Sequence, residues 1–321
     1  MATQTTGTIN TGSGALATKP QAYYDKMLLI LRRQKSFYHQ NLAQKRPMPK
    51  RSGDTINFRK IVGLAPQTTP LTEGVTPSGQ SASLTAISAT TKQYGGFIEF
   101  SDVVDFQQVD DVLKEYTVGL GDQANETLDV LTRDELAGGS NVWYANERTA
   151  RNQLVTGDVP AINDLRKAVL QMKKNHVKPA LRGKYVVIIS PETAFDLMDD
   201  PKFEKAYEIG QNSDPFINGE VANIYGMTFA EQVNAKVFAG EGGGTPAADV
   251  HASIVLGNQA YGVTTIKGEG DIKTIVKPLG SAGTTDPLNQ RQTIGWKVNA
   301  FVAKRLDETA IARYESVPSQ A

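Results

Sequence analysis

The side chains able to do chemistry are few in this sequence and stand apart from one another. The three histidines, His39, His176 and His251, have no carboxylate or second histidine at the spacing of metal ligands or of a catalytic triad. The adjacent acids at 110–111 and at 199–200 would point to different sides of a helix, which favours solvent or interface charges over an acid/base pair. The sequence therefore predicts no catalytic residues and no metal site.

Two glycine-rich stretches and the lack of cysteine narrow the chemistry further. Gly119 and Gly121 lie inside a helical pattern and do not follow a strand, and the stretch 240–244 lacks the Lys-Ser/Thr pair that would reach a phosphate. The chain has no cysteine, which excludes disulfides and thiolate ligands or nucleophiles. We expect no cofactor, and we do not expect an enzyme.

The element best specified by the sequence is a helix from Asp102 to Leu136. Its apolar residues recur at steps of three and four, which keeps one stripe on one face for about seven turns. They are Phe106, Val109, Leu113, Tyr116, Leu120, Ala124, Leu128 and Leu131. Ser101 or Asp102 can cap its start, and the pair 138–139 can close its end with left-handed glycine. The helix would be ~50 Å long, which is more than a compact core needs.

Gly119 and Gly121 stand in the interior of this predicted helix. Each destabilises a helix interior by roughly 1 kcal/mol relative to alanine. We therefore expect the two glycines to mark a bend or a close approach by another backbone. The alternative is a pair of ordinary helices broken at these glycines.

A projecting element is predicted ahead of the helix. Alternation of apolar residues predicts a half-exposed strand at 54–62 and the end of a returning strand at 94–100. Between them, residues 63–83 contain three prolines, three glycines and many hydroxyl groups, and cannot bury a core. Residues 50–100 are thus expected to form a two-stranded projection, which needs a partner surface because an isolated hairpin is marginally stable.

The rest of the chain predicts an α/β body and, with the elements before it, an α+β fold. Pro160 opens a helix, Ser190-Pro191 opens a second one, and a glycine-rich loop that we expect to be flexible spans 240–248. Strands are expected at 184–190, 224–229, 254–256 and 293–306. The longest apolar run, at 185–189, is far too short to span a membrane, so we expect a soluble protein with no membrane partner.

Charge is unevenly distributed although the net charge is zero. Residues 1–60 carry eleven lysines or arginines against two aspartates, a net charge of +9 that the remainder balances. A basic segment on an acidic body fits contact with nucleic acid, or contact with the body of another copy. Aromatic residues interleaved with this charge favour contacts between subunits.

The order of tail, projecting loop, long helix, α/β body and returning strand resembles the major capsid proteins of tailed phages, which share the Hong Kong 97-type fold. Three local phrases are similar to one branch of that family: YVVIISPETAFDLMDDPKF at 185–203, GNQAYGV at 257–263 and DPLNQRQTIGWK at 286–297. The resemblance implies five regions. They are an N-terminal arm (1–48), an extended β-hairpin loop (49–100), a peripheral domain (101–182) with a spine helix (102–136), an axial domain (183–275), and a C-terminal strand region (276–321) returning to the peripheral domain.

The resemblance also implies a function. Members of the family self-assemble into hexamers and pentamers of an icosahedral shell around double-stranded DNA, so the chain would occupy the virion capsid and assemble in the host cytoplasm. A portal protein and scaffolding or decoration proteins are the further partners implied. Some members are crosslinked through a lysine and an asparagine, for which Lys60 or Lys92 and Asn289 or Asn299 lie in the corresponding regions.

The residues expected at subunit contacts combine positive charge with aromatic rings in the first part of the chain. They are Tyr23, Arg32, Arg33, Phe37, Tyr38, Arg51, Phe58, Arg59, Lys60 and Lys92, with Gly119 and Gly121 as candidates for a bend in the spine helix. Two other classes stay open: a nucleic-acid-binding protein that uses the basic N-terminal segment, and a cytoplasmic α/β enzyme.

Overall fold

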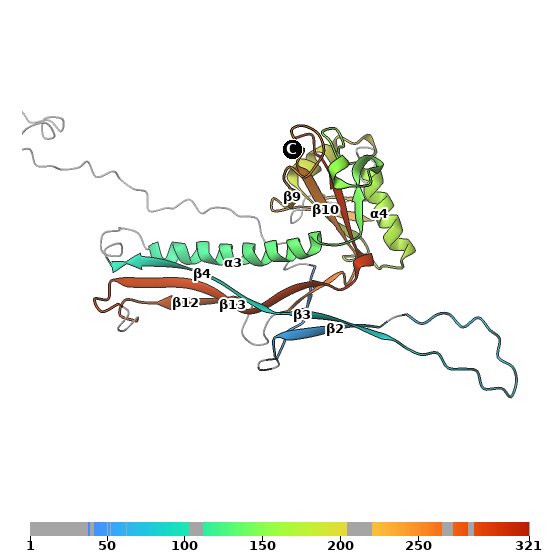
Figure 1. Ribbon diagram of the computed structural model, residues 1–321, viewed down its shortest axis with the longest axis horizontal. Coiled ribbons are helices and arrows are strands. Elements are labelled where there is room, and N and C mark those ends of the chain that lie inside the picture. Colours follow the sequence, from blue (N-terminus) through green and yellow to red (C-terminus); the bar gives the residue numbers. More distant parts are fainter. Residues whose placement is uncertain are drawn as a thin grey trace, which may run out of the picture.

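The computed structural model consists of an elongated half and an α/β body at one end of it (Figure 1). The structure describes residues 38, 42–49, 51, 53–61, 63–102, 112–203, 220–264, 272–281 and 286–320. The elongated half is a long helix on a long sheet, with a two-stranded hairpin that projects past the α/β body.

The elongated half is built on a five-stranded sheet in the order β1-β11-β13-β12, with β4 also paired to β13. Its strands are β1 (Gln44–Lys45), β4 (Lys92–Ser101), β11 (Tyr261–Thr264), β12 (Lys273–Lys277) and β13 (Arg291–Arg305), and its helix is α3 (Val112–Ala137). A separate two-stranded sheet is formed by β2 (Thr55–Ile61) and β3 (Leu84–Thr90). The 15-residue β13 confirms the long strand predicted at 293–306, but it is not the final strand, because β14 (Ile311–Ser316) follows it.

Helix α3 packs on β13 through the predicted apolar stripe. Leu120, Ala124 and Leu128 are buried in one cluster with Trp296 and Val298, which are inward-facing residues of β13. The indole Nε1 of Trp296 donates a hydrogen bond of 2.9 Å to the side chain of Gln123 on α3, which fixes the position of the helix along the strand. The two periodicities of the sequence, 3.6 in the helix and 2 in the strand, thus meet in one interface.

Several details of the predicted helix differ from the structure. Helix α3 runs through Gly119 and Gly121 without a break, so the alternative of two separate helices is wrong. A Cβ atom on either glycine would meet no described atom within 4 Å, so no backbone approaches closely there. The helix ends at Ala137 as expected, but Gly138 and Gly139 do not have a positive φ. The predicted turns at 103–111 lie outside the described residues.

The α/β body is built on a seven-stranded sheet in the order β5-β14-β10-β6-β8-β7, with β9 also paired to β10. Its strands are β5 (Val142–Tyr144), β6 (Tyr185–Ile189), β7 (Glu220–Ile224), β8 (Met227–Glu231), β9 (Lys236–Phe238), β10 (Val250–Leu256) and β14 (Ile311–Ser316). Its helices are α4 (Ile162–Lys174) and α5 (Pro191–Met198), with short 3₁₀ turns at Ala145–Glu147, Arg151–Gln153 and Glu308–Ala310.

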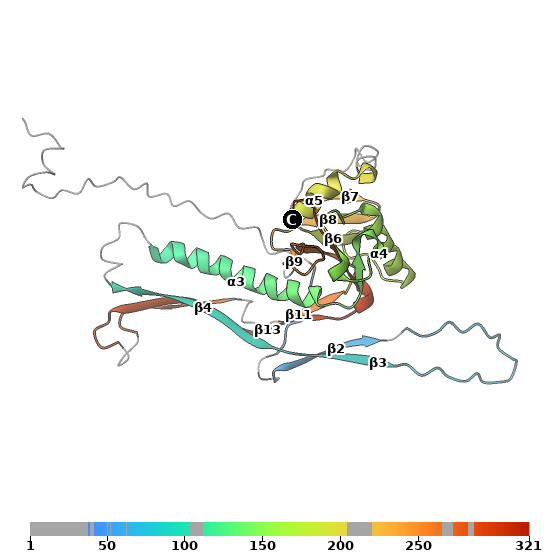
Figure 2. The same ribbon diagram turned by 45° about the horizontal axis from the view of Figure 1, so that its top comes forward.

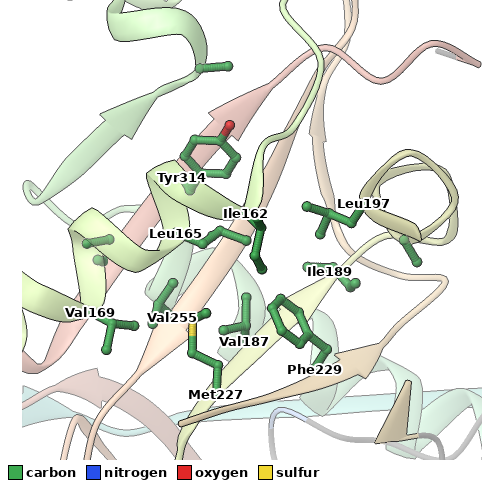
Figure 3. Packing of buried hydrophobic residues seen from close by; sticks show 14 of the residues in the cluster. Ile162, Leu165, Val169, Val187, Ile189, Leu197, Met227, Phe229, Val255 and Tyr314 are labelled. Carbon is green, nitrogen blue, oxygen red and sulfur yellow. The ribbon is translucent and has the colours of Figure 1, made fainter. Parts of the chain in front are cut away.

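The seven-stranded sheet is covered on both faces, as the continuous apolar run of β6 predicts. Val187 packs with α4 residues such as Leu165 in one cluster (Figure 3). Its neighbours Val186 and Ile188 point to the other face and join the cluster that contains Leu128 of α3. The two hydrophobic cores of the protein therefore lie on opposite faces of the same sheet and share its strands.

Buried charges also join α3 to the α/β body. Glu315 of β14 is fully buried, and its carboxylate accepts hydrogen bonds of 2.8 and 2.7 Å from Arg151. Arg313 lies 2.7 Å from the same carboxylate and donates to the carbonyl of Ala137, the last residue of α3. A cation at the carbonyl end of a helix is favourable because of the helix dipole. Arg313 thereby ties the end of α3 to the seven-stranded sheet.

One strand prediction is wrong in the α/β body. The run at 224–229, expected as a single strand, is a hairpin in which β7 and β8 are joined at Tyr225 and Gly226. The φ angles of these two residues are 53° and 78°, and positive φ at both central residues is what a tight two-residue hairpin turn requires. The continuous apolar pattern of the run concealed this turn.

The glycine-rich loop predicted to be flexible is packed against the chain before it. The amide of Gly243 donates a hydrogen bond of 2.6 Å to the carbonyl of Leu154, and the amide of Gly242 bonds the carbonyl of Ala248 at 3.0 Å. A Cβ atom on Gly243 would come within 2.6 Å of the carbonyl of Asn152. The glycines of this loop thus serve close backbone packing.

Strand pairing also crosses the predicted region boundaries. The segments β11 and β12, expected in the axial domain, belong to the sheet of the elongated half. Conversely, α4 and β5, expected in the peripheral domain, pack in the α/β body, and β14 of the C-terminal region pairs with β10. Hydrogen-bond pairing decides which body a segment joins, and the linear order of segments does not reveal it.

We expect the double substitution Gly119→Ala and Gly121→Ala to stabilise the protein by up to about 1 kcal/mol per site. The physical reason is that the added methyl groups enter open space while the unfolded chain loses conformational freedom. Urea denaturation of the subunit measures the change. A loss of stability would contradict the prediction, and stabilised subunits that fail to assemble would show that a bend at these glycines is required.

Candidate subunit-contact site

The hairpin of β2 and β3 is the most exposed element of the described chain, and it carries the candidate site. The two strands pair in register from Thr55 with Thr90 to Ile61 with Leu84. Residues 63–83, all of them described, form no helix or strand and extend away from the rest of the chain (Figure 2). The expected projection is thus present, but β4 is not part of it, because β4 pairs with β13.

The base of the hairpin is fixed to the elongated half by two side chains. Phe58 is 2% exposed, and its ring lies so close to Gly262 of β11 that a Cβ atom there would come within 2.7 Å of it. Lys60 forms an ion pair of 2.5 Å with Asp307, which follows β13. The start of the projection is therefore held in place by the chain itself.

Beyond this base the hairpin exposes apolar side chains. The exposed fractions are between 57% and 77% for Ile61, Leu64, Leu71, Val75 and Leu84. They cannot form a core of their own, because the loop that carries most of them has no second layer to pack against. A series of exposed apolar residues on a projecting segment is typical of a surface that another protein covers.

A family model described as phage capsid protein matches residues 85–314, which is most of the chain. The chain belongs to the phage capsid protein family. The match includes nearly all of β3, β4, α3 and most of both bodies, and it leaves out β1, β2 and the whole loop at 63–83. None of the curated proteins compared with the chain matches it.

Solved capsid structures share the fold over nearly the whole chain. The capsid of Ralstonia phage GP4 has a TM-score of 0.77 at 16% identity, covering 94% of this chain and 96% of that one. The capsid of cyanophage P-SCSP1u has a TM-score of 0.68 at 15% identity, covering 93% of both chains. The capsid of cyanophage Pam1 has the same TM-score and identity, covering 95% and 99%. The predicted Hong Kong 97-type α+β fold is confirmed.

Two residues predicted at subunit contacts are instead core residues of this capsid protein. Tyr38 is fully buried beside Tyr261, whose hydroxyl donates to the carbonyl of Tyr38, and burial raises the pKa of the Tyr38 phenol. Phe58 is buried at the hairpin base. Aromatic rings beside basic residues predict subunit contacts, but both of these rings are covered by the chain itself.

The predicted arm also ends earlier than residue 48. The strand β1, at Gln44–Lys45, pairs with β11, and Met48 is buried. Together with Tyr38, these residues belong to the elongated half. The described part of the predicted arm (1–48) is therefore fixed to the elongated half.

The other predicted contact residues have different positions. Arg51, Arg59 and Lys92 are exposed, and Lys60 is half-exposed in its ion pair with Asp307. Tyr23, Arg32, Arg33 and Phe37 lie outside the described residues. Of the predicted aromatic contact residues, the structure describes Tyr38 and Phe58, and neither is exposed.

The exposed apolar residues of the loop are not among the contact residues predicted from the sequence. Leu64, Leu71 and Val75 are isolated in a stretch of proline, glycine and hydroxyl residues, which suggested only that the stretch lacks a core. Their isolation in such a stretch could have indicated a contact surface, because apolar residues that cannot join a core within the chain are stabilised by another surface. Phe97 of β4, which is 72% exposed, is a further apolar residue that the sequence analysis does not single out.

A buried histidine in the α/β body, His251, has polar partners that the sequence does not predict. The Nδ1 atom of His251 lies 2.9 Å from Ser190 Oγ and 3.7 Å from Glu192 Oε2. A catalytic triad places the serine and the acid at different ring nitrogens, whereas here both approach the same one. Ser190 is 3% exposed and caps α5 by accepting from the amide of Thr193, so the cluster holds the start of the helix.

The described residues contain no group of three or more His, Asp or Glu side chains that could hold a metal ion. No helix of the described chain is long and apolar enough to cross a membrane. Belonging to the phage capsid protein family implies a structural role for the chain.

We expect the capsid protein to lose stability as the pH falls from 7 to 5, in part through His251. Burial lowers the pKa of His251 below its ordinary value of 6.5, although Glu192 and Asp249 act in the opposite direction. The neutral ring therefore contributes stability that is present above pH 6.5 and is lost as the pH falls through the lowered pKa. Urea denaturation at several pH values measures it.

The variant His251→Gln should show a weaker decline of stability over the same pH range, because its side chain does not titrate. His176→Asn, which replaces an exposed histidine, is the matched control and should keep the decline of the natural protein. Equal slopes for His251→Gln and the natural protein would show that His251 does not contribute.

Proposed function

We propose that this chain is the major capsid protein of a phage and that its copies assemble into hexamers and pentamers of an icosahedral shell enclosing double-stranded DNA. Portal protein and scaffolding or decoration proteins are the further partners, and assembly takes place in the host cytoplasm. The observation that carries the proposal is the projecting hairpin loop with its exposed apolar residues, in a chain of the phage capsid family.

The dimensions of the loop support contact with another copy. At about 3.3 Å per residue, the extended chain from Thr55 to Leu71 reaches ~50 Å from the base of the hairpin. A segment of this length passes beyond its own α/β body (Figure 1). An isolated hairpin is marginally stable in water, so a neighbouring subunit that covers the loop would also fix its conformation.

The position of the loop at one end of the chain supports a ring. A contact made by one end of a subunit on a different surface of the next is heterologous, and such contacts close into rings when the rotation between copies allows it. Hexamers and pentamers are rings of this kind, built from one type of contact with slightly different rotations.

We expect the triple substitution Leu64→Ser, Leu71→Ser and Val75→Ser to abolish shell assembly and to leave the subunit folded. All three side chains are exposed, so their removal should change the free energy of unfolding by no more than about 0.5 kcal/mol per site. Electron microscopy of the purified proteins measures the outcome: the natural protein should give shells, tubes or capsomers, and the variant should not.

A matched control changes the same loop without removing apolar surface. The substitutions Thr68→Ser, Thr76→Ser and Ser78→Thr should assemble normally. A natural protein that stays monomeric under all conditions would overturn the proposed function. A triple serine variant that forms normal shells would show that the apolar residues of the loop are not needed for assembly.

The alternative function, binding of nucleic acid, is favoured by the charge of +9 on residues 1–60. Binding through lysine and arginine to phosphates weakens steeply as salt rises. Residues 1–37 carry five of the eleven cations of this segment. If this part of the segment instead serves contacts between subunits, deleting residues 1–37 should impair assembly, and the soluble subunits should show little affinity for DNA. Tyr38 must be kept because it is part of the core.

Electrophoretic retardation of double-stranded DNA at 50 and 200 mM salt, with the full chain and with the chain lacking residues 1–37, tests this. The nucleic-acid-binding function would be established by two results together. The full chain binds DNA in a salt-dependent manner that is lost when residues 1–37 are deleted, and the shortened chain still forms normal shells.

A further inference from the structure

One end of the α/β body gathers positive charge in a part of the chain that is otherwise acidic. Residues 61–321 have a net charge of −9, yet residues 162–184 contain seven lysines or arginines and a single acid, Asp164. Lys167 forms ion pairs of 3.0 Å with Asp164 and with Glu147. The six other cations form what we call the basic end of the α/β body: Arg166, Lys173, Lys174, Lys178, Arg182 and Lys184.

Helix α4 carries three of these cations on the side that faces away from the core. Its buried residues, such as Leu165 and Val169, point into the core of the α/β body (Figure 3). Arg166, Lys173 and Lys174 are exposed. Because Lys173 and Lys174 follow Arg166 by seven and eight residues, the three lie along one side of the helix over about two turns, or ~11 Å.

A tight turn after α4 presents a further cation. The backbones of Leu181 and Lys184 exchange hydrogen bonds of 3.1 and 2.7 Å, and the φ angles of Arg182 and Gly183 between them are 45° and 79°. Positive φ at both central residues is typical of a tight two-residue turn. Arg182 is exposed at the tip of this turn.

The turn and α4 meet at the hairpin of β7 and β8. The amide of Tyr185, which follows the turn, donates a hydrogen bond of 3.0 Å to the carbonyl of Gly226. Next to Gly226, the ring of Tyr225 lies 4.3 Å from the guanidinium carbon of Arg166 on α4. The Nζ atom of Lys173 lies 5.9 Å from the centre of the Tyr185 ring. The cations of the helix and of the turn therefore lie at the same end of the body.

The charge of the basic end is not neutralised within the described chain. None of its six cations pairs with a carboxylate of the described residues, and all of them are exposed except the half-buried Lys184. Like charges that are held close together repel one another, and a bound polyanion relieves this repulsion. Since the cations come from several segments and span ~11 Å along α4 alone, an extended polyanion fits them better than a small anion does.

The kinds of residue at the basic end favour a phosphate backbone over an acidic protein. Four of the six cations are lysines, and lysine is depleted in protein–protein interfaces. Double-stranded DNA carries one negative charge per about 1.7 Å of its axis, so flexible lysines can reach phosphates in any register. Leu170 and Leu181 are exposed at this end, but single exposed apolar residues are normal on a protein surface.

We propose that the basic end of the α/β body contacts the phosphate backbone of the double-stranded DNA inside the shell. This inference rests on the proposed function and names the surface of each copy that meets the DNA. Non-specific contacts of this kind are weak for one subunit, with dissociation constants of about 10⁻⁴ to 10⁻⁶ M at physiological salt. Copies in one shell bind the same duplex together, so the assembled protein retains DNA better than single subunits do.

Nuclease protection tests the contact. The full chain is assembled with short fragments of double-stranded DNA at 50 or 200 mM salt and treated with nuclease, and the DNA in the sedimented shells is measured. We expect the natural protein to protect DNA at 50 mM salt and much less at 200 mM salt, because phosphate contacts weaken steeply with salt. The variant Lys173→Gln with Lys174→Gln should protect about tenfold less DNA at 50 mM salt.

Two matched controls separate the position of the charge from its amount. Lys173→Arg with Lys174→Arg keeps the charge of the basic end and should protect as much DNA as the natural protein. Lys202→Gln with Lys277→Gln removes the same charge from exposed positions elsewhere and should also protect the natural amount. All variants keep residues 1–37, so any DNA held by that segment is common to them.

The possible failures are distinguishable. If the natural protein forms no shells with or without DNA, the proposed function fails. If its shells protect no DNA, or if the double glutamine variant protects as much as the natural protein, the further inference fails while shell assembly stands. If the double glutamine variant does not assemble even without DNA, whereas both controls do, the basic end contacts another protein copy and the inference is overturned.

Discussion

The rest of the structure depends on the contact between the apolar stripe of α3 and the inward side chains of β13. Leu120, Ala124 and Leu128 pack against Trp296 and Val298, and the hydrogen bond from Trp296 to Gln123 sets the position of one element along the other. Because both elements are long, the contact produces an elongated half that no compact core would support. The hairpin base, the sheet of the elongated half and the junction with the α/β body are all positioned by it.

The polar side chains at the end of α3 connect the helix to the seven-stranded sheet, whereas the apolar contact connects it to β13. Arg313 bonds the last carbonyl of the helix and pairs with Glu315, whose buried carboxylate also holds Arg151. Removing one partner from such a buried network leaves an uncompensated charge, so the network favours the arrangement in which the end of α3 meets β14.

The sequence predicted the elements of the fold more successfully than their partners. The stripe of α3, the alternation of β13 and the run of β6 each repeat with a period that belongs to one type of element, so they could be recognised locally. The pairing of β4 with β13, the contact of His251 with Ser190 and the burial of Tyr38 depend on residues distant in sequence. Charge and aromaticity predict the candidate contact residues in the sequence, whereas in the structure the exposed apolar residues of the loop are the feature that suggests a contact surface.

The sharing of β6 between two cores has a mechanical consequence for the subunit. Val187 packs on α4 while Val186 and Ile188 pack on the side of α3, so neither body can separate from the other without exposing a face of this strand. A force that enters through the hairpin passes through β13 and α3 into a strand fixed on both sides. The load is thus borne by sheet hydrogen bonds and two packed cores instead of by a flexible linker.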